Sequence, residues 1–152
     1  MDIGKIVQEI QYVLAPAVMV SSSALLLLGF QNKFSSLANR FRTLNHEKRL
    51  LAQKSVRDPT EANRFESLVK QIDQLMCRAG YVKNAILLSY VGIVCFTGTS
   101  VLIFLNVYTS FQIFNWITAL FLLGLLCVLL SSVLMIFETS LFYQIISIER
   151  KS

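Results

Sequence analysis

The chain contains 53 consecutive residues, 85–137, without a single Asp, Glu, Lys, Arg or His. Leu, Ile, Val and Phe occur throughout this run, and only 15% of the whole chain is charged, against about a quarter of a typical soluble domain. A helix needs about 20 apolar residues to cross a bilayer, so the run is too long for one span and long enough for two. The sequence therefore predicts an all-α integral membrane protein.

The uncharged run breaks near 108–112, where polar and aromatic residues suit a turn at the membrane interface. This break predicts one span at 85–107 and another at 113–137. An earlier apolar stretch at 13–30 is long enough for a third span. No small-residue cleavage site follows that stretch, and acidic residues precede it, so we interpret it as a retained span and not as a signal peptide.

The segment before the first span, residues 1–12, is apolar on one side. Ile3, Ile6, Val7 and Ile10 share one helical face ahead of Pro16. A short amphipathic helix lying on the outer surface of the membrane fits this pattern. A simple N-terminal extension of the first span fits it equally well.

The basic residues are concentrated between the first two spans. Residues 31–84 hold 11 of the 14 Lys and Arg residues and 5 of the 9 Asp and Glu residues. Loops rich in Lys and Arg stay in the cytosol, so we expect the N-terminus outside and the tail at 138–152 inside. Three basic residues near the spans are expected to meet anionic lipid headgroups: Lys33, Arg78 and Lys83. A block placed in this way does not indicate nucleic-acid binding.

The basic segment also carries the pattern of two helices. Apolar residues recur at alternating spacings of three and four on both sides of Asp58 and Pro59, as in a left-handed helix pair. Pro59 suits the first turn of a helix, and Asp58 suits its N-cap. We therefore expect helices at about 16–56 and 60–107 that extend from the membrane as a cytosolic antiparallel coiled-coil hairpin. Its predicted seam, which we expect to stay largely exposed, consists of Phe34, Leu37, Phe41, Leu44, Leu51, Phe65, Leu68, Ile72 and Leu75.

Small and hydroxyl-bearing residues interrupt the first span. Side chains of this kind let two membrane helices approach closely, which favours a packing face. A polar pore lining is the alternative. The candidate residues for either role are Ala17, Ser21, Ser22, Ser23 and Ala24.

Glu138 ends the third apolar run and lies near the inner boundary of the hydrocarbon core. A carboxylate at this depth must reach water or pair with a cation. The candidate partners are Lys33, Arg40 and Lys83. A ring of such carboxylates in an oligomer, able to coordinate ions, is the alternative.

Motifs for catalysis or metal binding are missing from the sequence. Cys77, Cys95 and Cys127 form no C-x-x-C pair, and His46 is the only histidine. The sequence has no glycine-rich phosphate loop and no H-E-x-x-H motif. We therefore expect no cofactor and no enzymatic activity.

Three sequence blocks resemble a known family. The first is 15–29, continued by 31–33 and 39–44; the second is 78–86; and the third is 137–140, which ends the last span. In these blocks the chain is similar to a bacterial family of small three-span membrane proteins known only as a domain of unknown function. The resemblance implies a helical inner-membrane protein and no particular activity. It supports the testing of four polar residues: Asn32, Arg40, Arg42 and Glu138.

Two functions are compatible with these features. An exposed apolar seam without catalytic groups favours a non-enzymatic, self-associating membrane protein, either a scaffold or an accessory subunit of a membrane assembly. The alternative is a homo-oligomeric ion channel with a serine-lined pore and Glu138 at its inner mouth. An enzyme acting on a lipid or quinone is less consistent with the sequence, because redox and nucleophilic groups are missing.

Overall fold

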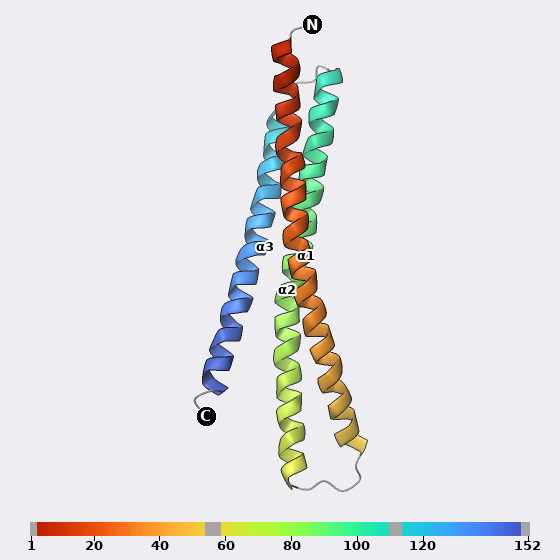
Figure 1. Cartoon of the computed structure of the whole chain (residues 1–152), viewed down its shortest axis with the longest axis vertical. Coiled ribbons are helices and arrows are strands. Elements are labelled where there is room, and N and C mark those ends of the chain that lie inside the picture. The colour runs from red at the N-terminus through yellow and green to blue at the C-terminus, as the bar shows by residue number, and fades with distance from the viewer. Residues whose placement is uncertain (1–2, 54–58, 110–113, 150–152) are drawn as a thin grey trace.

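The protein consists of three long helices in its described residues (Figure 1). The computed structural model describes residues 3–53, 59–109 and 114–149, with side chains described at 11, 14–53, 59–106 and 114–140. Helix α1 is Ile3–Gln53, α2 is Pro59–Thr109 and α3 is Phe114–Glu149. Every residue in these three ranges is helical, as the sequence predicts for an all-α chain.

Helices α1 and α2 form one antiparallel pair, and each contains 51 residues. At about 1.5 Å per residue, each extends roughly 75 Å, far beyond the thickness of a bilayer core. Helix α2 begins at Pro59, the predicted starting position, whereas Asp58 lies outside the described residues. The prediction that both helices continue from the apolar part of the chain into the charged part is confirmed.

Helix α1 continues without interruption through Pro16. The backbone therefore follows the second of the two predictions for the N-terminus, a helical extension of the first span. The side chains of Ile3, Ile6, Val7 and Ile10 lie outside the described residues. An apolar face of this segment resting on a membrane surface stays a prediction.

Each helix contains a stretch that is long and apolar enough to cross a membrane. These candidate spans lie within Leu14–Gln53, Pro59–Asn106 and Phe114–Ser140. They indicate a multi-pass membrane protein with three spans. Helix α2 lies between the other two and packs against both of them.

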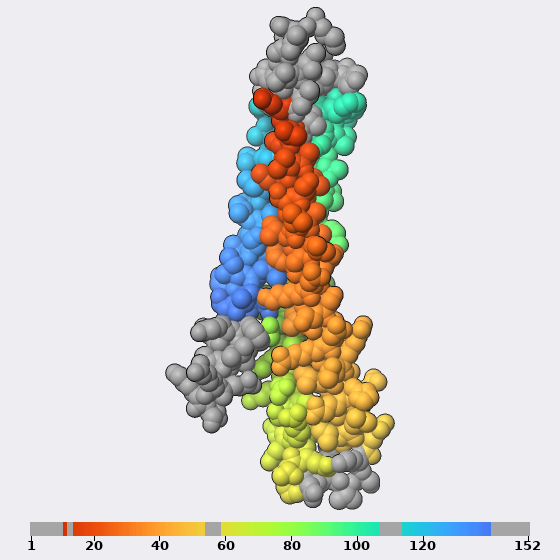
Figure 2. All heavy atoms as spheres, in the orientation of Figure 1, coloured from red at the N-terminus to blue at the C-terminus, as the bar shows by residue number. Residues whose placement is uncertain are grey.

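The charged parts of α1 and α2 extend beyond the end of α3 (Figures 1 and 2). We call the charged part of the α1 and α2 pair the hairpin: residues 33–53 of α1 with 59–84 of α2. Leu37 of α1 and Leu75 of α2 are buried in one apolar cluster, which continues towards the spans through Val82.

The predicted seam lies mainly between the two arms of the hairpin. Leu37, Leu68, Ile72 and Leu75 are buried, and most of the other seam residues are half-buried. Only Phe34 is exposed, at 39%. The expectation that a two-helix stalk leaves much of its seam open is therefore wrong, because the arms bury these side chains against each other. An exposed seam cannot be the reason for self-association.

Candidate functional site

Glu138 is the one fully buried ionisable side chain among the described residues. It lies on α3, at the end of the apolar part nearest the hairpin. Removing a carboxylate from water costs several kcal/mol, so a buried one is stable only when cations and hydrogen bonds surround it.

Two cations from the other two helices surround this carboxylate. Arg78 of α2 donates two hydrogen bonds to Glu138 Oε1, from Nε at 3.0 Å and from Nη2 at 2.8 Å. The ammonium of Lys33, on α1, forms an ion pair with Glu138 Oε2. We call Lys33, Arg78 and Glu138 the ion triad. It joins all three helices at one level of the molecule.

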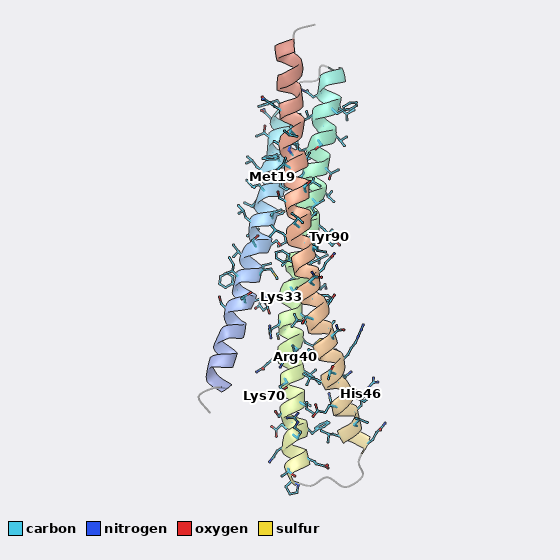
Figure 3. The ribbon with its side chains drawn as sticks, viewed as in Figure 1. Met19, Lys33, Arg40, His46, Lys70 and Tyr90 are labelled. Carbon is cyan, nitrogen blue, oxygen red and sulfur yellow. The ribbon has the colours of Figure 1, made fainter. Side chains whose placement is uncertain are left out.

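Lys33 is the member of the ion triad that reaches towards the surface. It lies midway along α1 (Figure 3), and 32% of its side chain is exposed, against 13% for Arg78. Its ammonium also donates a hydrogen bond to Thr139 Oγ1 at 2.9 Å. The Thr139 hydroxyl in turn donates to the Met135 carbonyl at 2.8 Å. Charge-assisted hydrogen bonds of this kind are stronger than neutral ones, so the ion triad stabilises the position of α3.

The sequence-predicted partners of Glu138 separate into two groups. Lys33 contacts the carboxylate, whereas Arg40 and Lys83 have exposed side chains. Arg78 was expected at the lipid headgroups and not at this carboxylate. Sequence distance from the predicted turn at 108–112 does not select Arg78, because Lys83 lies almost as far before the centre of that turn as Glu138 lies after it.

Two further interhelical contacts on α3 share the face of Glu138. Ser131 donates a hydrogen bond to the Ala85 carbonyl at 2.7 Å, and its oxygen is 2.7 Å from the Ser89 hydroxyl. Because the single Ser131 proton is used on the carbonyl, the Ser89 hydroxyl is the donor between the two serines. Hydrogen bonds of this kind connect helices in an environment without water.

The third contact on this face depends on small residues. A Cβ added at Gly92 would lie 3.2 Å from the Gly124 carbonyl oxygen and 2.7 Å from Val128 Cγ2. A Cβ added at Gly124 would lie 3.0 Å from the Cβ of Cys95. Only glycine allows the two backbones to approach so closely, as in other tightly packed membrane helices.

Of the small residues predicted on the first span, Ala17, Ser21 and Ala24 share one exposed side of α1, and Ser23 does not belong to it. Ser23 is buried, whereas Ala17, Ser21 and Ala24 are exposed, as is Ser22. The hydroxyls of Ser21 and Ser22 donate to the carbonyls of Ala17 and Val18 four residues earlier, at 3.3 and 3.0 Å. These bonds satisfy the two hydroxyls inside their own helix and leave the side chains on the surface.

Comparison with known proteins identifies the family. A family model described as "Protein of unknown function (DUF2721)" matches residues 13–148, which include all three candidate spans. The chain belongs to the DUF2721 family. No curated protein and no solved structure matches this DUF2721 chain significantly.

The arrangement of polar residues in this DUF2721 protein favours a structural role for the ion triad. Both of its cations are bound to the carboxylate, which leaves Glu138 without exposure to a substrate. Within the described residues, no three side chains of His, Cys, Asp or Glu come together as a possible metal site.

Proposed function

We propose that this DUF2721 member is a non-enzymatic, self-associating protein of the bacterial inner membrane. It serves as a scaffold or accessory subunit of a membrane assembly. The hairpin is a cytosolic antiparallel coiled coil, and the N-terminus lies outside. The basic content of residues 31–84 supports this orientation.

One observation carries the proposal of self-association: α1 exposes a line of five residues, four of them small, that runs from the apolar part of the helix into the start of the hairpin. Ser21, Leu28 and Ser35 are seven residues apart and exposed, and Ala17 and Ala24 flank Ser21 on the same side. We call these five residues the α1 stripe. Lipid forms no hydrogen bonds with hydroxyls, whereas a second helix packs closely against small residues.

The exposed surface of α3 is a useful contrast, because it has the composition expected for contact with lipid. Its exposed large side chains between 122 and 137 are Leu122, Leu123, Leu126, Leu129, Leu130, Val133, Ile136 and Phe137. The α1 stripe interrupts the exposed apolar surface of α1. A second copy packed on α1 would remove that interruption from lipid.

The test is the mass of the intact protein in lipid nanodiscs, measured by native mass spectrometry together with any copurifying lipid or protein. We expect an oligomer. Ala17→Leu combined with Ser21→Leu should reduce it to the monomer, because bulky side chains prevent close approach. Ala119→Leu is the matched control, since Ala119 is an exposed small residue on α3. A monomeric wild-type protein without any copurifying partner would contradict the proposal.

A homo-oligomeric channel is the second candidate, and the exposure of Ser21 and Ser22 favours it. In that case the serine side of α1 lines a water-filled pore and does not pack against a second helix. Flux through liposomes that is abolished by Ser22→Leu supports the channel, and an oligomer without flux at any voltage counts against it. Ser22 is the better test residue, because Glu138 is committed to the ion triad.

A further inference from the structure

Several charged side chains of the hairpin are exposed and form no ion pair within the described part of the chain, and four of them lie at matched spacings on the two arms. Arg42 and Arg49 lie seven residues apart on α1, and Glu66 and Asp73 lie seven residues apart on α2. Seven residues make about two helical turns, so each pair occupies one face of its helix. All four side chains are exposed, and within the described residues none of them forms an ion pair.

The contact between the two arms shows where these charges lie along the helix axes. Arg64 Nη2 lies 2.9 Å from Glu47 Oε1, and Leu37 and Leu75 are buried in one cluster, so positions 64 and 47, like 75 and 37, are about level in the hairpin. By the same register, Glu66 is about level with position 45 and Asp73 with position 38. Along the helix axis, Glu66 is therefore offset from Arg49 by about four residues, or roughly 6 Å. Asp73 is offset from Arg42 by the same amount.

Copies of a membrane protein with the same orientation sit at the same depth, so these heights are also the heights in a neighbouring copy. The two arginines are spaced by about 10 Å along the axis, and so are the two acids. The offset is the same in size and direction for both pairs, and an arginine side chain is long enough to cover it. The Arg42 and Arg49 face of one copy can therefore contact the Glu66 and Asp73 face of another copy through both charge pairs at once.

The arginines also continue the surface on which the proposed function rests. Arg42 and Arg49 follow Ser35 at the seven-residue spacing of the α1 stripe, and all of these residues are exposed. A copy that packs on the α1 stripe in the membrane therefore passes alongside both arginines. Lys70 lies between the two acids, which leaves the α2 face with a net charge of −1 against +2 on α1.

We infer that a second copy of this chain docks its Glu66 and Asp73 face on the α1 surface formed by Ser35, Arg42 and Arg49. This inference rests on the proposed self-association and specifies the surfaces that meet. Opposite charges at matched spacing favour this alignment, and like charges oppose the alternatives. Salt bridges between exposed residues are individually weak, so they select the alignment more than they supply the affinity.

A native thiol offers a direct test. Cys77 is exposed and lies four residues beyond Asp73 on the same face of α2. By the register above it is about level with Ser35 on the α1 stripe. We expect Ser35→Cys to form a disulfide with the neighbour's Cys77 when an oxidant is added to full-length protein in membranes, giving a product of twice the chain mass. Ser36→Cys, about 100° round the helix, is the control and should form little of this product.

Adding Cys77→Ser to Ser35→Cys should abolish the product, because it removes the receiving thiol. A product that persists joins two copies through α1 alone and would refute the inference.

Charge reversal tests the electrostatic part. In the Ser35→Cys background, Arg42→Glu with Arg49→Glu should lower the yield of cross-linked product roughly tenfold, as should Glu66→Arg with Asp73→Arg. Coexpression of the two reversed chains should restore it between unlike chains.

The remaining outcomes separate the two proposals. An oligomer by native mass that gives no cross-link at Ser35 and ignores charge reversal overturns the docking face but leaves self-association intact. A monomer overturns both. A cross-linked product that contains a different protein shows that the occupant of the α1 face is not a second copy.

Discussion

Replacing Glu138 by leucine tests whether the ion triad holds the three helices together. The substitution leaves Arg78 without its carboxylate while only 13% of the arginine side chain is exposed. Breaking a buried ion pair by removing one partner costs about 3–5 kcal/mol. Lys33 adds little to this cost, because its side chain is 32% exposed and can turn to water. We therefore expect Glu138→Leu to lower the free energy of unfolding by about 3 kcal/mol.

The matched control is Glu47 with Arg64, an ion pair between α1 and α2. Its side chains are 39% and 57% exposed, and Arg64 donates two hydrogen bonds to the same carboxylate oxygen. The geometry thus resembles that of Arg78 and Glu138, but water is present. Exposed pairs contribute about 0–1 kcal/mol, so Glu47→Leu should cost less than about 1 kcal/mol.

The assay is a titration with sodium dodecyl sulfate in mixed micelles, with helix content followed by far-UV circular dichroism. A triple variant, Glu138→Leu with Arg78→Met and Lys33→Met, should recover most of the lost stability, because replacing all members of a buried ionic group by apolar residues is often neutral. The reasoning is refuted if Glu138→Leu costs no more than Glu47→Leu. It is also refuted if the triple variant is as unstable as the single one.

Three further predictions concern packing and orientation. Gly124→Ala should destabilise the protein by about 1–3 kcal/mol in the same titration, because the new Cβ lies 3.0 Å from the Cys95 Cβ. Gly29→Ala is the control and should cost nothing, because its new Cβ meets nothing within 4 Å. Ser131→Ala should cost about 1 kcal/mol by the same measurement, because it removes the interhelical hydrogen bond to the Ala85 carbonyl. A reporter enzyme inserted at position 58 should be found on the cytosolic side of the membrane. A reporter found outside would reverse the proposed orientation.

Much of the fold follows from one-dimensional properties of the chain. The uncharged run, the basic block and Pro59 predict the number of helices, the start of α2 and the place of the turns. Each of these depends on local composition, which a single sequence displays directly. The burial of Leu68 and Leu75 between the arms follows from the three-and-four spacing in the same way.

The candidate site was predicted less completely. The position of Glu138 at the end of an apolar run indicates that it needs a cation. Lys33, one of the predicted partners, forms an ion pair with it. The choice among several nearby cations depends on how each helix is rotated about its axis. Hydropathy does not report that rotation, and Arg78 was therefore not selected. The exposure of a helix face also depends on its neighbours, so the burial of Ser23 apart from Ser21 could not be predicted either.

The ion triad also explains why α3 adopts a single register on α2. On α2, Arg78, Ala85 and Gly92 are seven residues apart, and they lie level with Glu138, Ser131 and Gly124, which are also seven apart.

Small residues repeat at this spacing, so a slip of α3 by two turns would again place a small residue, Ser131, level with Gly92. Such a slip would place Glu138 level with Ala85, deeper in the apolar region and away from Arg78. A carboxylate without a cation at that depth costs several kcal/mol, far more than the loss of one hydrogen bond between serines. The close glycine contact therefore permits α3 to pack on α2, while the buried charges determine where along α2 it packs.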